Sequence, residues 1–288
     1  MKQRLKVLIK SCHSFFSNLS KSIIWIIYVL RHENLTPYIK QKNQPKKLLI
    51  LANGPKLNEC IKNGIPEIEC SDIRVVNDFC RSELFFSVKP TSYVFADPFF
   101  FSDEMNERHK QIWNAFSKVN WNMTLFVPYL AFTKMTKQIL NPNIKICPYH
   151  PIPYEGWKSV RFLLYKKGLS MPRPQNVVIP SIFIGINEGY KQIDLYGVDH
   201  SWTKEIRVNN NNQVCLINSH FFDNKTPELK PWHKGIGEPV YKMHEILRDL
   251  AWMFDGYYKL REYADNIGCR IINKTPDSFI DAFEREIK

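Results

Sequence analysis

The clearest signal for the fold of this 288-residue chain is the segment Leu48-Leu49-Ile50-Leu51-Ala52-Asn53-Gly54-Pro55. Four consecutive apolar residues run into a loop in which Gly54 allows a tight turn. A strand of a parallel sheet is buried on both faces, so it has an unbroken apolar run instead of an alternating pattern. The stretch therefore predicts a buried parallel strand that ends in a ligand-binding loop, as in nucleotide-binding α/β domains.

Similar short runs recur along the chain and alternate with helical patterns. The predicted strands are Leu48–Ala52, Arg74–Val76, Ser92–Phe95, Thr124–Val127, Ile144–Cys147, Asn176–Ile179, Gln192–Tyr196 and Arg270–Ile272. This alternation predicts a single Rossmann-like domain over residues 48–288, with a mostly parallel sheet and helices on both faces. A long helix is expected over Glu238–Asn266. Thr275-Pro276-Asp277 predicts the start of a final helix that Thr275 caps.

The segment from about residue 202 to residue 236 has little periodicity and predicts a long loop or a hairpin lid. Asn209–Asn212 is expected to form a turn within it. Long loops in compact domains are often functional, so the lid is expected to take part in the site.

The positive charge of the chain is concentrated near its N-terminus. Of the net charge of +12, residues 1–45 contribute +7, and Lys46 and Lys47 bring this to +9. The remaining 241 residues therefore carry only about +3. A nucleic-acid-binding protein is expected to carry a basic face on its folded domain. The distribution of charge argues against a nucleic-acid partner.

Residues 1–33 predict a basic amphipathic helix, and the polar residues 34–47 predict a linker. Apolar residues recur at steps of three and four, at positions 5, 8, 12, 15, 19, 23, 26 and 30. The run Ile23–Leu30 is much shorter than the roughly 20 residues that cross a bilayer. Arg31 follows it where a signal peptide would have small residues. Such a helix fits the surface of an anionic membrane, and the alternative is packing on its own domain or a second subunit.

Several signatures of other chemistries do not occur in the sequence. The seven cysteines form no CxxC pair, so they predict reduced thiols and no disulfide framework or zinc ribbon. The chain has no GxGxxG, Walker, GxSxG or DxD motif. The sequence therefore requires no metal and no cofactor, and it does not fit NAD enzymes or serine hydrolases.

Polar residues follow the predicted strands at the edge where a parallel sheet binds its ligands. They are Asn53, Gly54, Pro55, Asn77, Asp97, Pro98, Gly197, Asp199 and His200. Ser181, after the predicted strand Asn176–Ile179, is a suitable N-cap residue, and a helix N-terminus attracts phosphate. Together these residues predict a binding site at the carboxyl edge of the sheet.

The order of these residues resembles the bacterial sialyltransferases of glycosyltransferase family 42 over roughly Leu48 to Phe283. The matching segments are Asn53-Gly54-Pro55-Lys56, Val75-Val76-Asn77, Ala96-Asp97-Pro98-Phe99-Phe100, Pro180-Ser181-Ile182, Leu195-Tyr196-Gly197-Val198-Asp199 and Asn218-Ser219-His220-Phe221. The resemblance implies an inverting, metal-independent transferase that moves sialic acid or a related ulosonic acid from a CMP-activated donor to a bacterial surface glycan or glycolipid. The chain departs from the family pattern at Lys56, Asp97, Ile182 and Phe221.

An inverting transfer needs a base for the acceptor hydroxyl and stabilisation of the departing phosphate. The candidate bases are His220, within the Asn-Ser-His match, His233, further along the lid, and His200, next to Asp199. Candidates for the stabilisation of the leaving group are Tyr196, Lys204, Arg207 and Lys234.

Two other interpretations remain open. A Rossmann-like phosphotransferase or pyrophosphokinase could share the strand that runs into Asn-Gly-Pro, and a non-catalytic scaffold for polysaccharide assembly would not need the histidines. The favoured interpretation is a cytoplasmic enzyme, peripheral on the inner face of the cell membrane and held there by its basic helix. Related enzymes form oligomers, so the resemblance is compatible with a homo-oligomer.

Overall fold

The computed structural model describes residues 2–31, 39, 47–103, 106–217, 220–222, 228–235 and 237–286, and for residues 2–10 only the backbone. These residues form a large sheet with strand order β11-β10-β6-β1-β2-β3-β4-β5, and all neighbouring strands are parallel. The strands are β1 (Leu48–Leu51), β2 (Asp72–Val76), β3 (Ser92–Val94), β4 (Met123–Pro128), β5 (Ile144–Tyr149), β6 (Gln192–Tyr196), β10 (Arg270–Asn273) and β11 (Glu284–Arg285). The predicted Rossmann-like α/β fold is confirmed.

Strand β1 lies at the point where the direction of winding reverses. From β1 the chain moves outward through β2, β3 and β4 to β5, and then returns to place β6 on the other side of β1. The connections that leave the carboxyl ends of β1 and β6 therefore diverge, and open α/β sheets bind ligands at such a point.

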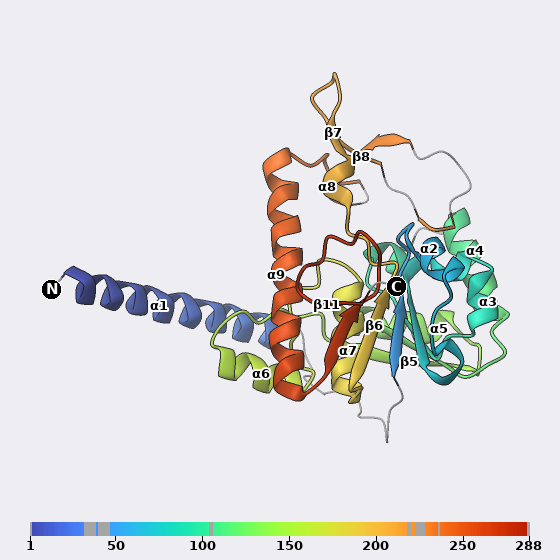
Figure 1. Ribbon diagram of the computed structural model, residues 1–288, viewed down its shortest axis with the longest axis horizontal. Helices are drawn as coiled ribbons and strands as arrows, with labels where there is room; N and C mark the ends of the chain where they lie inside the picture. Colours follow the sequence, from blue (N-terminus) through green and yellow to red (C-terminus); the bar gives the residue numbers. More distant parts are fainter. Residues whose placement is uncertain are drawn as a thin grey trace.

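The sheet separates two hydrophobic cores, as the apolar run in β1 predicts. Leu48 and Ile50 face one core, Leu49 and Leu51 face the other, and all four are fully buried. The first core is completed by α6 (Lys158–Lys166), α7 (Val178–Glu188) and α9 (Met243–Ile267), and the second by α2 (Leu57–Lys62), α3 (Leu84–Val88), α4 (Glu107–Ser117) and α5 (Tyr129–Gln138). Figure 1 shows these two groups of helices on opposite sides of the sheet.

The predicted strand Asn176–Ile179 is wrong, because helix α7 begins at Val178 and Asn176 and Val177 lead into it. The side-chain Oδ1 of Asn176 accepts hydrogen bonds from the N–H groups of Val178 (2.8 Å) and Ile179 (3.2 Å), which caps the helix. Ser181, expected to be the cap, lies one turn inside α7. The hydrophobic run of α7 is buried on all sides, and such a run looks alike in a buried strand and a buried helix.

Two further expectations near the C-terminus need correction. The long helix begins at Met243 and not at Glu238, because Val240 pairs with His233 in a β-bridge. The final helix after Thr275 does not form. Instead the Thr275 hydroxyl accepts a hydrogen bond from the Val198 N–H (3.0 Å), and the Phe279 N–H donates to the Asp199 carbonyl (2.9 Å). The polar groups of this segment thus hold the loop after β6 in place of starting a helix.

The predicted lid contains a small antiparallel sheet. It is formed by β7 (Ile206–Val208), β8 (Val214–Ile217) and β9 (Leu229–Pro231), after the short helix α8 (Trp202–Glu205). The expected turn at Asn209–Asn212 joins β7 to β8, with a hydrogen bond from the Asn212 N–H to the Asn209 carbonyl (3.0 Å). This hairpin projects beyond the carboxyl edge of the main sheet (Figure 1).

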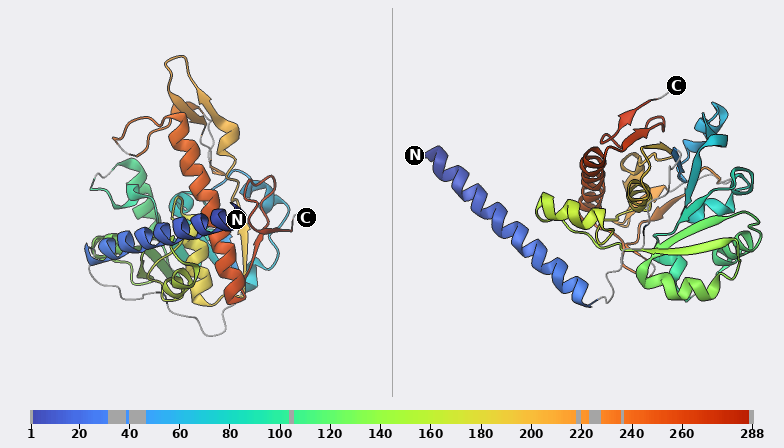
Figure 2. Two further views of the ribbon diagram at one scale, coloured as in Figure 1. Left: turned by 90° about the vertical axis from the view of Figure 1, so that its left-hand side faces the viewer. Right: turned by 90° about the horizontal axis from the view of Figure 1, so that it is seen from below.

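The predicted N-terminal helix is present as α1 (Lys2–Arg31), which extends away from the body of the protein as a straight rod (Figures 1 and 2). Of the predicted linker 34–47, only Ile39 and Lys47 are among the described residues. No helix in the described part of the chain is long and apolar enough to cross a membrane.

All seven cysteines are free thiols. Three short 3-10 helices, η1 (Ile68–Cys70), η2 (Asn77–Arg81) and η3 (Pro98–Phe101), complete the described elements.

Candidate functional site

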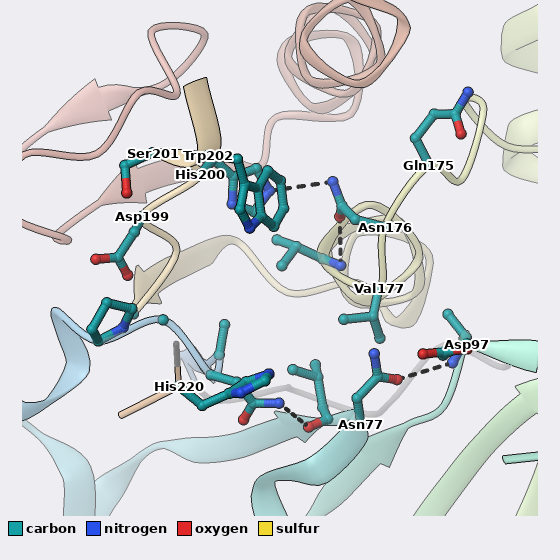
Figure 3. A pocket seen from close by; sticks show the side chains of 18 of the residues that line it. Asn77, Asp97, Gln175, Asn176, Val177, Asp199, His200, Ser201, Trp202 and His220 are labelled. Carbon is teal, nitrogen blue, oxygen red and sulfur yellow. Dashed lines mark hydrogen bonds between the residues drawn. The ribbon is translucent and has the colours of Figure 1, made fainter. Parts of the chain in front are cut away.

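A pocket of about 440 Å³ lies at the carboxyl edge of the sheet, where the connections that follow β1 and β6 diverge. Loops after β1, β2, β3 and β6, the start of α7 and the lid all contribute to it. The predicted residues that line it are Asn53, Gly54, Pro55, Asn77, Asp97, Pro98, Gly197, Asp199, His200 and His220. A volume in this range suits a nucleotide-sized ligand. Figure 3 shows the pocket with its main polar side chains.

The loop after β1 is held tightly against the loop after β6. The Gly54 N–H donates to the Gly197 carbonyl (2.9 Å), and the Lys56 N–H donates to Asp199 Oδ1 (3.0 Å). A Cβ atom on Gly54 would collide with the Asp199 carboxylate and lie 2.5 Å from the Gly197 carbonyl oxygen. Gly197 itself has a φ of 66°, and a Cβ there would lie 2.8 Å from Leu57 Cβ. Glycine is therefore needed at both positions.

Two buried oxygen atoms in this wall have no hydrogen-bond donor among the described residues. They are Asn53 Oδ1 and Asp199 Oδ2. The Asn53 amide is fixed because its Nδ2 donates to the Val76 carbonyl (3.1 Å), which leaves Oδ1 available. Burial raises the pKa of the Asp199 carboxyl to about 6, and the hydrogen bond from the Lys56 N–H opposes this rise. A buried acceptor without a donor is costly, so this wall is suited to a ligand that brings hydroxyl or amino groups.

The opposite wall presents the start of α7 and a side-chain amide. Asn176 and Val177 lie across the cavity from Asp199, and the Asn77 amide points into the same space (Figure 3). Asn77 has a φ of 44°, and its Oδ1 accepts from the Ala96 N–H (3.3 Å), so its NH2 group is left toward the pocket. The N-terminus of an α-helix carries a partial positive charge that attracts anions.

The lining residues that carry a full charge are acidic: Asp97, Asp199 and Glu205. Asp97 also has a local role, since its Oδ1 accepts from the Phe99 N–H (2.9 Å) and caps η3, which begins at Pro98. The Val178 and Ile179 N–H groups already donate to Asn176, and Pro180 has no N–H. An anionic group in this pocket would consequently be held by the dipole of α7 and by the Asn77 amide.

The three candidate histidines have different environments. His200 lines the pocket, but its Nε2 lies 2.6 Å from the Tyr257 hydroxyl and 3.2 Å from Asn176 Nδ2. Burial lowers the pKa of His200 to about 3. His200 is therefore neutral, and its Nε2 is used in binding α7 and α9 to the pocket wall.

His220 is brought to the pocket by a short segment of the lid. The next residue, Phe221, donates its N–H to the Asn53 carbonyl (3.1 Å) and packs its ring on Phe79 at 5.2 Å. The Asn58 side chain donates to the Phe221 carbonyl (2.6 Å). These contacts place the His220 ring over the loop after β1, on the side of Asp199 (Figure 3). Asn218 and Ser219 of the matched motif lie outside the described residues.

Other predicted residues lie away from the pocket lining. His233 is exposed next to β9, where its Nδ1 bonds the Glu238 carbonyl (2.8 Å). Ser181 is fully buried within α7 and donates its hydroxyl to the Val177 carbonyl (2.7 Å). The departures Lys56 and Ile182 are also elsewhere, in ion pairs with Glu59 and Asp277 and in the hydrophobic core, respectively. The proposed leaving-group residues Tyr196, Lys204, Arg207 and Lys234 do not line the pocket either.

Several residues that line the pocket were not predicted from the sequence, namely Gln175, Asn176, Val177, Ser201, Trp202 and Glu205. Asn176 was overlooked because it was assigned to the incorrect strand, although an Asn before a long apolar run is a signal for a helix cap. The Trp202 ring lies against the His200 ring at an angle of 35°, with ring centroids 4.7 Å apart. No group of three or more His, Cys, Asp or Glu side chains that could hold a metal occurs within the described ranges.

Comparisons with known proteins add little to this geometry. No protein-family model matches the chain, and no curated protein has a matching sequence. The solved structure of the MAf glycosyltransferase from Magnetospirillum magneticum AMB-1 is similar over 86% of this chain and 35% of that chain, at 11% sequence identity and a TM-score of 0.47. This chain thus matches only about a third of that protein's length. A likeness this weak says nothing about activity, so the function is inferred below from the residues of the pocket.

Proposed function

We propose that the protein is an inverting, metal-independent glycosyltransferase that uses a CMP-activated sugar, sialic acid or a related ulosonic acid. The observation that carries this proposal is the polarity of the pocket. One wall offers the unpaired acceptors Asn53 Oδ1 and Asp199 Oδ2, and the other offers the start of α7 and the Asn77 amide. A nucleotide has the matching arrangement, with hydroxyl and amino donors at one end and a phosphate at the other.

The chemistry of the pocket favours a donor with one phosphate over a sugar diphosphate. The charged lining residues are acidic, so a phosphate here depends on the helix N-terminus and on amide donors. A single phosphodiester needs less compensation of charge than a pyrophosphate, which transferases commonly hold with cations. CMP-sugars have the single phosphate, whereas UDP-sugars and GDP-sugars have two.

His220 is the proposed base for the acceptor hydroxyl of a glycan or glycolipid. Its ring lies in the pocket, whereas burial lowers the pKa of His200 to about 3, which makes it a weak base, and His233 lies outside the lining. Asp199 would bind the donor on the same side of the pocket. The lid that carries His220 would also cover the bound nucleotide and keep water from the reacting carbon.

The binding test uses thermal unfolding of the full chain in the presence of CMP, CDP, UDP, GDP or ATP. CMP is expected to raise the midpoint most, because binding to the native state stabilises it. No shift with CMP, together with a shift with ATP and Mg²⁺, would replace the proposal with the phosphotransferase alternative. The absence of any nucleotide effect would favour the non-catalytic scaffold.

The catalytic test compares His220→Ala with His233→Ala, using hydrolysis or transfer from a CMP-sugar. Loss of a general base typically reduces the rate by about 10²–10⁴-fold. His220→Ala should show this loss with CMP binding retained, and His233→Ala serves as the matched control in the same lid. If instead His233→Ala loses activity and His220→Ala does not, the role belongs to His233.

A further inference from the structure

Helix α1 packs on the body mainly through residues beside its apolar stripe, and of the stripe Phe15 also touches the body, edge-on to the Trp157 ring at 5.7 Å. Asn18, Ser22, Trp25 and Val29 are half-buried and recur at helical spacing. They face the loop before α6, where the Ser22 hydroxyl lies 2.8 Å from the Tyr154 hydroxyl and the Trp25 ring meets Tyr154 edge-on at 5.9 Å. The contact is thus small and partly polar.

The apolar stripe of α1 is exposed. Among the stripe positions with described side chains, Phe15, Leu19, Ile23, Ile26 and Leu30 are all at least 37% exposed, and Leu30 reaches 76%. Phe16, Ile24, Ile27 and Tyr28 are exposed as well. Nine of the 20 large apolar side chains that are exposed in the described structure therefore lie on this one helix. A contiguous apolar surface of this kind marks an interaction site.

The charge of α1 identifies the kind of partner. Its sequence contains six Lys or Arg residues and no Asp or Glu, which is half of the net charge of the whole chain. Two copies of such a helix would repel one another, whereas an anionic lipid surface attracts basic residues and accepts apolar side chains. α1 is too polar to cross a membrane, so it would lie along the interface.

We propose that the exposed stripe of α1 binds the surface of an anionic membrane and that the Ser22–Trp25 side holds the protein body to the helix. The helix is thus shared between two partners, with the body on one side and lipid headgroups and acyl chains on the other. Figure 2 shows α1 standing clear of the body for most of its length, which leaves the stripe accessible. This role is independent of the chemistry in the pocket.

The experiment is flotation of the full chain with vesicles of phosphatidylglycerol and phosphatidylcholine, compared with vesicles of phosphatidylcholine alone. The protein should float with the anionic vesicles, and salt should weaken the binding. The triple variant Leu19→Ser, Ile23→Ser and Ile26→Ser should bind at least tenfold more weakly. These side chains are exposed, so the fold should persist, and circular dichroism with CMP thermal shifts would verify this.

The matched control is Leu130→Ser with Leu140→Ser, which removes two highly exposed apolar side chains from outside α1. It should bind vesicles like the unchanged protein. Equal binding of the stripe variant, or equal binding to neutral and anionic vesicles, would overturn the proposal. A dimer in solution that the stripe variant dissociates, without any vesicle binding, would assign the stripe to a second copy of the chain. If CMP binding is absent but vesicle binding behaves as expected, the proposed glycosyltransferase activity is contradicted and the membrane proposal stands.

Discussion

One cluster of buried polar groups lies beside the body of α7 and another lies in the pocket across from its N-terminus, and the two clusters differ in how well their groups are paired. Beside the body of α7, the Arg74 guanidinium is fully buried and donates to the Ser92 hydroxyl (3.0 Å), the Ser181 carbonyl (2.8 Å) and the Glu188 carboxylate. Near the N-terminus, the pocket contains Asn53 Oδ1 and Asp199 Oδ2 without donors among the described residues.

This difference separates a structural cluster from a candidate binding site. The Arg74 cluster binds β2, β3 and α7 together, and its donors are used within the protein. The pocket leaves acceptors unpaired at a cost in stability, and natural proteins tend to keep such a cost at functional sites. Variants of the Arg74 cluster should therefore change the stability of the fold, and variants of the pocket should change the binding of a ligand.

The largest effect is expected for Glu188→Ala. It leaves the buried charge of Arg74 without its carboxylate, which costs about 3–5 kcal/mol of the free energy of unfolding. Urea denaturation would measure the loss. The matched control is Glu284→Ala, which breaks the ion pair with Arg270 at the surface and should change the unfolding midpoint little. Equal effects of the two variants would show that the Arg74 cluster is not a special contributor to stability.

Asp199→Asn should affect both ligand binding and the pH dependence of stability. The folded pKa of about 6 is above the ordinary value of 3.8, so the folded protein keeps a proton that the unfolded chain has already released. The contribution of Asp199 to stability therefore falls as pH rises from about 4 to about 6, by up to about 3 kcal/mol. The variant should lack this fall and bind CMP more weakly. Unfolding curves across this pH range measure the fall; if Asp199 is not its cause, the variant and the unchanged protein will give the same profile.

Gly54→Ala is expected to disturb the pocket directly. The added methyl group would displace Asp199 and the loop after β6, and overpacking of this kind costs about 1–3 kcal/mol. The main consequence should be loss of the CMP-induced thermal shift. Gly64→Ala is a useful comparison, because a Cβ there has open space although its φ of +76° is unfavourable. Retained CMP binding in Gly54→Ala would contradict the assigned position of the nucleotide.

The smallest effect is expected for His200, which lines the pocket but whose Nε2 is paired with neighbouring side chains. Its folded pKa of about 3 is below the ordinary 6.5, so the unfolded chain binds a proton more readily. The contribution of His200 to stability is complete above about pH 6.5 and falls as pH is lowered, by about 2 kcal/mol at pH 5. His200→Asn should flatten this part of the profile. A normal acid slope in the variant would assign the loss to other groups.

Much of the fold could be predicted from short-range patterns. The apolar run of β1 and the short β-rich segments that follow it located the sheet, and Gly54 and Gly197 marked the loops that meet above it. Ten of the predicted lining residues do line one pocket, because parallel strands bring their carboxyl ends to a common edge. The predicted strand Asn176–Ile179 was wrong because an apolar run without a clear period does not distinguish a strand from a helix. The predicted final helix was wrong because the Thr275 hydroxyl accepts a hydrogen bond from Val198, which is distant in sequence, and does not cap a helix.

Sequence patterns alone predict the two-sided burial of the sheet, the turn glycines, the basic amphipathic character of α1 and the position of polar residues after the strands. These features depend on neighbours in the chain and on periodicity. The folded structure was needed to show that His200 is paired, that His220 reaches the pocket, that Asp199 has an oxygen without a donor among the described residues and that the apolar stripe of α1 is exposed. Hydrogen-bond pairing and burial depend on contacts between residues far apart in sequence, which no local pattern contains.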